Sequence, residues 1–161
     1  MTSTDLIAEA RELARSRYIE GRHHVFSALR TKRGKVFTGV HIEGGVGRVS
    51  VCAEAIAIGA AATAGDTDIE EIVAVTESGQ IVPPCGMCRE LISDYAAEAR
   101  VIVEVAGVIE AKGVGDLLPF KYRSADYPNL RKSDVPNHSP LPMPGTSPES
   151  NRRPPPGMAG L

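Results

Sequence analysis

Three cysteines and a glutamate stand in two short motifs whose residue types could bind and use a metal ion. The first motif is Cys-Ala-Glu at 52–54, and the second is Pro-Cys-Gly-Met-Cys at 84–88. Three thiolates can hold zinc and leave its fourth position open, as a catalytic site requires, and the chain has no fourth cysteine to close the site. We therefore expect Cys52, Cys85 and Cys88 to bind a catalytic zinc ion. A structural zinc site, a redox Cys-x-x-Cys pair and three buried thiols are the alternatives.

Two charged side chains beside these cysteines suggest what the metal would do. Glu54 stands in an apolar, Ala-rich segment, where a carboxylate is costly unless it is used or paired. Beside a metal-bound water, it could accept the water's proton and pass it to a ring nitrogen. Arg89 follows Cys88 directly, and its guanidinium could offset the negative charge of three thiolates. An ordinary solvated carboxylate and an exposed arginine are the plainer interpretations.

Two helices must bring these residues together. The apolar pattern predicts a buried helix over about 51–64 and a second helix over 86–97. We expect the cysteines in the first turns of these helices, where the partial positive charge of a helix N-terminus favours thiolates. On a regular helix, side chains two residues apart point in directions that differ by about 200° around the helix axis. Glu54 can therefore join Cys52 only if the first turn is irregular or the metal lies near the helix end.

The remaining elements predict an α/β domain. Strands that alternate with helices through short connections favour a three-layer α/β/α sandwich around a mixed sheet. The expected elements are a helix at 4–18, a hairpin of strands at 24–30 and 35–42, a Gly-rich loop at 43–48, strands at 69–76, 101–105 and 108–111, and a helical turn at 115–118.

Composition and length limit the chain to one catalytic domain. Of its 161 residues, 42% are apolar and 24% are charged, as in ordinary globular proteins. We expect a catalytic domain at 1–123 and a Pro-rich tail at 124–161, either mobile or extended, or else packed across a neighbouring subunit. With a net charge of -2, the chain has no excess of positive charge of the kind that binding to a nucleic-acid backbone favours. Without an apolar span or a signal segment, no membrane partner and a cytoplasmic location are expected.

The two motifs together resemble the signature of the cytidine deaminase superfamily. The resemblance is to small nucleoside cytidine deaminases and to blasticidin-S deaminases, and it extends from about residue 18 to 122. It implies that Cys52, Cys85 and Cys88 hold zinc, that Glu54 shuttles protons, and that the backbone N–H of Ala53 binds the pyrimidine carbonyl oxygen. The implied reaction is hydrolytic removal of an amino group as ammonia. Pyrimidine salvage and a homotetramer are the implied role and assembly.

Two histidines depart from the family pattern on the side expected to bind the sugar. Cytidine deaminases usually show Gly-x-Asn-x-Glu, and residues 39–43 read Gly-Val-His-Ile-Glu. Glu43 fits this pattern, but His41 replaces an amide that offers both a donor and an acceptor. His23 stands where the family commonly has a phenylalanine that stacks on the base. A surface histidine and an ordinary loop charge are the plainer interpretations of these positions.

These observations support several functions. The first is deamination of cytidine or 2′-deoxycytidine, which rests on Glu43 and on its spacing to Cys52. The second is deamination of an aminonucleoside antibiotic such as blasticidin S, or of a free or modified base, which rests on His41, His23 and Tyr122. A zinc-binding scaffold without turnover is a third interpretation. Polynucleotide editing is a fourth, and the absence of a basic surplus argues against it.

Overall fold

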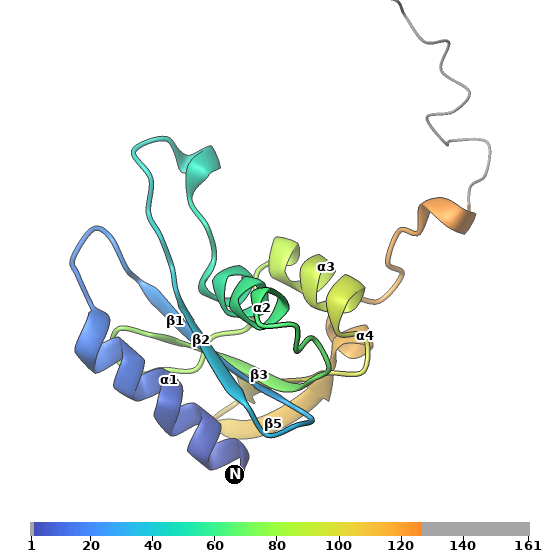
Figure 1. Ribbon diagram of the computed structural model, residues 1–161, viewed down its shortest axis with the longest axis horizontal. Helices are drawn as coiled ribbons and strands as arrows, with labels where there is room; N and C mark the ends of the chain where they lie inside the picture. Colours follow the sequence, from blue (N-terminus) through green and yellow to red (C-terminus); the bar gives the residue numbers. More distant parts are fainter. Residues whose placement is uncertain (1, 127–161) are drawn as a thin grey trace, which may run out of the picture. The chain divides into compact units, whose positions relative to one another are not determined.

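A five-stranded mixed sheet with helices on both faces forms the compact part of the molecule (Figure 1). The computed structural model describes residues 2–126, so the expected tail lies almost entirely outside the described residues. The elements are α1 (Ser3–Arg17), β1 (Val25–Thr31), β2 (Val36–Val40), α2 (Ala53–Thr63), β3 (Ile69–Thr76), α3 (Gly86–Tyr95), β4 (Arg100–Val105), β5 (Val108–Gly113) and α4 (Val114–Leu117), with single 3-10 turns at Gly47–Val49 and Ser124–Asp126.

The strand order is β2-β1-β3-β4-β5. The β1–β2 hairpin is antiparallel, β1 also pairs antiparallel with β3, and β4 pairs antiparallel with β5. Only β3 and β4, which α3 connects, run parallel. The expected mixed sheet is confirmed.

Alternation along the strands divides the core into two layers. Phe26 and Ala28 of β1 pack with Leu6 and Ala10 of α1 on one face of the sheet. Leu29, the residue after Ala28, packs on the other face with the buried side of α2. The three-layer arrangement follows because each face of the sheet is apolar and each face is covered by a helix.

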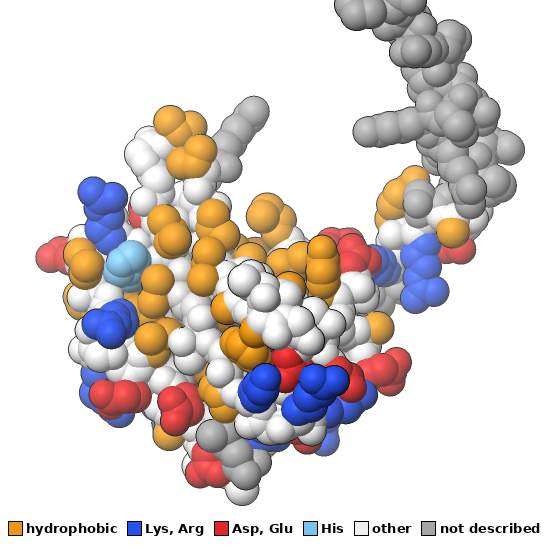
Figure 2. Space-filling view, viewed as in Figure 1, with side chains coloured by type: hydrophobic (Ala, Val, Ile, Leu, Met, Phe, Trp, Pro, Cys, Tyr) orange, Lys and Arg blue, Asp and Glu red, His pale blue; other side chains and the backbone are white. Residues whose placement is uncertain are grey.

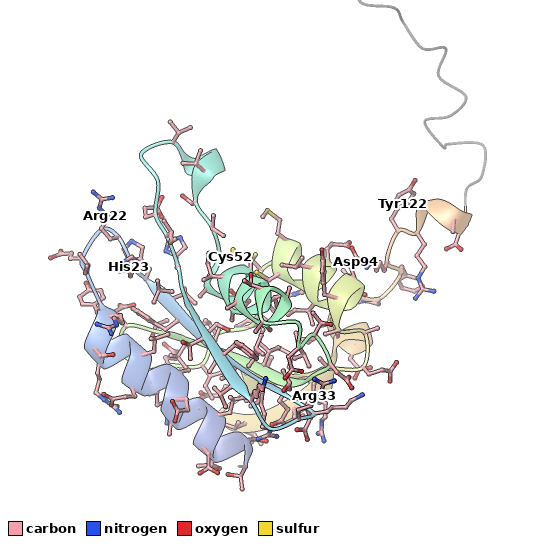
Figure 3. The ribbon with its side chains drawn as sticks, viewed as in Figure 1. Arg22, His23, Arg33, Cys52, Asp94 and Tyr122 are labelled. Atoms are coloured by element: carbon pink, nitrogen blue, oxygen red, sulfur yellow. The ribbon has the colours of Figure 1, made fainter. Side chains whose placement is uncertain are left out.

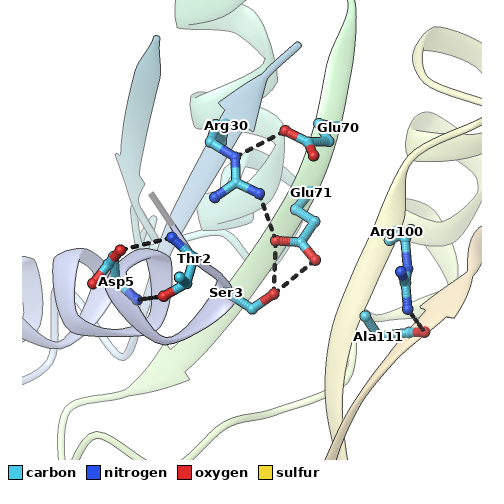
Figure 4. A network of polar contacts seen from close by, with 8 residues as sticks. All are labelled: Thr2, Ser3, Asp5, Arg30, Glu70, Glu71, Arg100 and Ala111. Atoms are coloured by element: carbon cyan, nitrogen blue, oxygen red, sulfur yellow. Dashed lines mark hydrogen bonds and ion pairs between the residues drawn. The ribbon is translucent and has the colours of Figure 1, made fainter. Parts of the chain in front are cut away.

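A buried charge network fastens α1 to the sheet (Figure 4). The Arg30 guanidinium forms ion pairs of 3.0 Å with Glu71 and 2.9 Å with Glu70, and the Arg30 and Glu71 side chains are 8% and 7% exposed. Ser3 at the start of α1 donates its hydroxyl to the Glu71 carboxylate at 2.8 Å. Buried charges persist only when they are paired and hydrogen-bonded, so this network stabilises the position of the α1 N-terminus. Thr2 caps the helix through a capping box with Asp5.

Most element boundaries differ from the sequence expectation by one or two residues, and three of the differences are informative. The helix expected from about residue 51 begins at Ala53, because Val51 is held in an antiparallel bridge with Ile42. The expected loop at 43–48 contains the beginning of a 3-10 turn. The short strand expected at 108–111 extends to Gly113, because β5 pairs with β4 along its whole length.

The first compact unit ends at Lys121, and Tyr122 begins a second unit that the structure describes only to residue 126. The predicted domain boundary at 123 stays a prediction. Within residues 2–126, no helix combines the length and the apolar character needed to cross a membrane.

Candidate active site

The three cysteines converge where α2 and α3 begin. Their Sγ atoms all lie within 4.8 Å of one another, and those of Cys52 and Cys85 are 3.6 Å apart. Four ligands around zinc at the usual Zn–S distance of about 2.3 Å place sulfur atoms about 3.8 Å apart, so the group fits a zinc ion. Among the described residues, no histidine, carboxylate or further cysteine joins the group. The fourth position is therefore open, as in catalytic zinc sites.

Helix ends position the thiols. Cys52 is the N-cap of α2, Cys85 is the N-cap of α3, and Cys88 lies in the first turn of α3. The two N-cap cysteines thus stand one position before the helices rather than within their first turns. Neither helix start has a side-chain cap, so the unpaired N–H groups and the helix dipoles face the thiolates. Because the Cys52 thiol lies at the end of the helix axis, Glu54 reaches the same site without an irregular turn.

The thiols sit in different environments. Burial raises the pKa of Cys52 and of Cys88, and the neighbouring Glu54 carboxylate raises the pKa of Cys88 further. Burial also opposes ionisation of Cys85, but hydrogen bonds from the Cys88 backbone N–H and the Cys52 thiol bring its pKa below the ordinary value. Zinc binds thiolates, so its uptake would release protons from these groups.

Glu54 is almost completely buried, at 5% exposure, in a pocket of about 120 Å³. Burial raises the pKa of Glu54, and this outweighs the opposing hydrogen bonds from its own backbone N–H and from the Cys88 thiol. A carboxyl group with a raised pKa is suited to accepting and returning a proton near neutral pH. The pocket is lined by Val25, His41, Cys52, Ala53, Glu54, Val82, Pro83 and Cys85.

A glycine lets β2 approach the start of α2. A Cβ atom on Gly39 would lie 2.2 Å from the Ala53 carbonyl oxygen and 2.6 Å from the Ala57 nitrogen. Ala53 is the first residue of α2, so its backbone N–H has no acceptor within the helix and lies beside the pocket. Sequence analysis missed the role of Gly39, although a lone glycine within a strand pattern often marks such a close approach.

Comparisons with known proteins agree with the zinc site that this geometry indicates. The family model described as "Cytidine and deoxycytidylate deaminase zinc-binding region" matches residues 1–104. The chain belongs to the cytidine deaminase family. With the zinc-site geometry of its three cysteines, it is a zinc-dependent hydrolytic deaminase.

Relatives of this deaminase fall into two named activities. The chain is 45% identical to the blasticidin-S deaminase of Bacillus cereus over 126 residues, which cover 73% of this chain and 90% of that protein. It is 32% identical to a cytidine deaminase of Halalkalibacterium halodurans over 124 residues, covering 75% and 94%. The cytidine deaminase structure from Burkholderia pseudomallei superposes with a TM-score of 0.65 at 32% identity, covering 76% of this chain and all of that one.

His41 stands where β2 ends and forms the wall opposite the helix ends. Its side chain is 15% exposed, its Nε2 lies 3.4 Å from Glu43 Oε2, and its backbone N–H donates to Val25 O. Its Nδ1 is buried without a hydrogen-bond partner among the described residues. The Ser50 hydroxyl donates to Glu43 Oε1 at 2.8 Å and accepts from Gly44 N–H. The deaminase thus holds Glu43 through Ser50, a residue that sequence analysis did not single out.

His23 and Arg89 make contacts other than those expected. His23 Nδ1 lies 2.7 Å from the His41 carbonyl oxygen and donates to it, so His23 holds the backbone of His41. Arg89 donates to the carbonyl oxygens of Pro84 and Leu117, which links the segment before Cys85 to α4. Stacking by His23 and charge compensation by Arg89 stay predictions. Tyr122 belongs to the second unit, and its part in substrate choice also stays a prediction.

An apolar groove of about 510 Å³ lies on the other side of the cysteines, between α2 and α3. Cys52 and Cys88 line it together with Val51, Met87 and Leu91, and Met87 is 73% exposed. Figure 2 shows apolar side chains gathered on this face of the molecule. The groove brings apolar surface directly beside the zinc site, and no sequence motif indicated it.

Proposed function

We propose that this enzyme deaminates the cytosine ring of a nucleoside, with an aminonucleoside antibiotic of the blasticidin-S type as its preferred substrate. The observation that carries the reaction is the buried Glu54 in one pocket with Cys52 and Cys85, two of the three converging cysteines. The substrate preference is supported by 45% identity to a blasticidin-S deaminase against 32% to a cytidine deaminase. It is also supported by His41, which replaces the amide usual in cytidine deaminases.

The residues of the pocket supply each part of a hydrolytic deamination. Cys52, Cys85 and Cys88 would hold zinc, which would supply Lewis acidity for the attack of water. Glu54 takes one proton from the attacking water as the oxygen adds to the amine-bearing carbon, and passes it to the ring nitrogen. Glu54 then takes the second proton from the added hydroxyl and gives it to the amino group. The carbon–nitrogen bond breaks, ammonia leaves, and the hydroxyl oxygen becomes the new carbonyl oxygen. The Ala53 N–H orients the ring by donating to its carbonyl oxygen.

Cytidine and 2′-deoxycytidine are the second candidate substrates. The observation that favours them is Glu43, which lies 3.4 Å from His41 and at the spacing from Cys52 that nucleoside deaminases use. A carboxylate beside the pocket can accept hydrogen bonds from sugar hydroxyls. In this alternative, His41 would take over part of the role of the family amide.

A substrate panel tests the proposal. Ammonia release is measured from blasticidin S, cytidine, 2′-deoxycytidine and cytosine, with zinc content determined on the same preparation. We expect about one zinc per chain and the highest kcat/KM for blasticidin S. Highest activity on cytidine would reverse the order of the two candidates. Full zinc without turnover of any compound would overturn the enzymatic proposal in favour of a zinc-binding scaffold.

We further propose that the enzyme is a homotetramer in which other copies cover the apolar groove between α2 and α3. The groove is almost entirely apolar and has exposed Met87 at its edge, and large exposed apolar patches commonly mark interfaces. Light scattering at micromolar concentration tests this assembly, and a monomer mass would overturn it. Cytoplasmic location and a part in pyrimidine salvage stay predictions.

A further inference from the structure

The catalytic pocket is too small for a whole nucleoside. Its volume of about 120 Å³ lies below the roughly 300–1,000 Å³ of typical small-molecule sites. The reacting ring can occupy it, but the sugar and anything attached to the sugar must lie outside. The question is which neighbouring surface receives them.

Two hollows adjoin the pocket, and they differ in chemistry. The groove between α2 and α3 shares Cys52 with the pocket and is almost entirely apolar. The other hollow, of about 270 Å³, is lined by Gly21, Arg22, Glu43, Gly44 and Gly45, and we call it the Arg22 hollow. It adjoins the pocket through the 3.4 Å contact between Glu43 and His41. A sugar is polar, so the Arg22 hollow suits it and the apolar groove does not.

The Arg22 hollow is built by contacts between the turn before β1 and the segment after β2. The Glu43 N–H donates to the Arg22 carbonyl oxygen at 3.0 Å, which joins these two segments. The Glu43 carboxylate is already engaged: Oε1 accepts from Ser50, and Oε2 faces His41. The negative charge of the Glu43 carboxylate is therefore directed toward Ser50 and toward His41, which lines the catalytic pocket.

Arg22 brings an uncommitted positive charge to this hollow. Its side chain is exposed and forms no hydrogen bond or ion pair within residues 2–126. Figure 3 shows Arg22 next to His23, at the same end of the molecule as the segment that follows β2. A guanidinium offers paired, coplanar donors that match the geometry of a carboxylate.

We propose that the Arg22 hollow is a subsite for an anionic group, a carboxylate, on the sugar side of the substrate. The inference rests on the proposed deamination and adds to it one residue, Arg22, that selects among its substrates by the charge carried on the sugar side. The ring enters the zinc pocket, the sugar passes His41 and Glu43, and the carboxylate pairs with Arg22. Arg22 thereby determines specificity and takes no part in the bond-breaking steps.

Kinetics on matched substrates test the subsite. We would measure kcat/KM for cytidine-5′-carboxylic acid and for its neutral primary amide, using the zinc-loaded wild type, Arg22→Gln and Arg22→Lys. Arg33→Gln is the matched control, because Arg33 is an exposed arginine at the opposite end of the molecule (Figure 3). We expect the wild type and the control to prefer the acid by roughly fivefold at low salt, the size of an exposed ion pair. Arg22→Gln should abolish this preference through KM, and Arg22→Lys should keep most of it.

A binding measurement separates failure of the subsite from failure of the proposed reaction. Calorimetry with uridine-5′-carboxylic acid and uridine, on the same variants, requires no turnover. If no cytosine nucleoside is deaminated but the acid binds more tightly in an Arg22-dependent manner, the reaction is wrong and the subsite stands. Equal use and equal binding of charged and neutral compounds by the wild type would overturn the subsite. An equal loss of preference in Arg33→Gln would also overturn the subsite, because it would show that the preference for the acid depends on the net charge of the protein and not on Arg22.

Discussion

The two walls of the catalytic pocket are built in different ways. The helix-end wall is formed by Cys52, Cys85 and Glu54, with Cys88 completing the cysteine group, and the starts of α2 and α3 determine its geometry. The β2-end wall is formed by His41, with Glu43 in contact with it, and side-chain contacts from His23 and Ser50 hold these two residues in place.

The helix-end wall matches the family signature, whereas the β2-end wall departs from it. In the function proposed above, the chemistry belongs to the wall where backbone geometry leaves little freedom. Substrate specificity belongs to the wall where one side chain can replace another without disturbing a helix. The following predictions test that division, and each substitution should affect only the property assigned to its wall.

The largest effect should come from removing a zinc ligand. Cys85→Ser should lose the metal and all activity, because a neutral hydroxyl is a far weaker zinc ligand than a thiolate. Metal analysis of purified protein should show a fall from about one zinc per chain to nearly none. Met87→Leu is the control, since Met87 lies between two ligands but is 73% exposed. A Cys85→Ser protein with full zinc would show that the cysteines are not the metal site.

Replacing the proton shuttle should separate chemistry from metal binding. Glu54→Gln should reduce kcat by roughly 10²–10⁴-fold while zinc content and fold are kept, because the amide cannot carry the proton. Glu104→Gln, an exposed change of the same type on β4, should leave kcat unchanged. Near-wild-type turnover by Glu54→Gln would contradict the mechanism proposed for the helix-end wall.

Two glycine substitutions should have opposite effects on stability. Gly39→Ala forces a Cβ atom against the backbone of α2 and should destabilise the fold by about 1–3 kcal/mol, with loss of zinc affinity. Gly59→Ala, on the open side of α2 with nothing within 4 Å, should stabilise the helix by up to about 1 kcal/mol. Denaturant unfolding at one protein concentration compares them. Destabilisation by Gly59→Ala would instead indicate that another copy packs on that side of α2.

The smallest effect should be a change in substrate preference at the β2-end wall. His41→Asn restores the amide usual in the family and should raise the kcat/KM ratio of cytidine to blasticidin S by about tenfold, the value of one hydrogen bond. His24→Asn is the control, because the His24 ring contacts that of His41, with centroids 5.6 Å apart, but does not line the pocket, so the ratio should stay near its wild-type value. A loss of zinc or of all activity in His41→Asn would mean that the two walls are not independent.

Much of the helix-end wall was predictable from sequence. The cysteine spacing and the apolar segments identified the ligands, the two helices and Glu54, because metal chemistry requires particular residue types and a buried helix requires a continuous apolar pattern. The order of helices and strands along the chain was also predictable, because turn residues and alternation are local signals, whereas the order of the strands within the sheet was not predicted. Helix starts were less certain: Val51 reads as helical but pairs with Ile42 across a loop.

The β2-end wall was less predictable because its contacts join residues that local patterns do not relate. Nothing in the local sequence shows that His23 donates to the His41 carbonyl group, or that Ser50 holds Glu43. Both contacts depend on how the turn before β1 and the loop after β2 fold back on each other.

By itself, the sequence indicated which groups could carry out the chemistry: three cysteines, one glutamate and two helices that can present them. The tertiary structure decided how these groups meet. It placed Cys52 and Cys85 at helix N-caps, brought β2 against α2 through Gly39, and set Arg22 beside Glu43. The physical reason is that residue type limits which reactions are possible through local chemistry, whereas distances between groups far apart in sequence depend on the packing of the whole sheet and its helices.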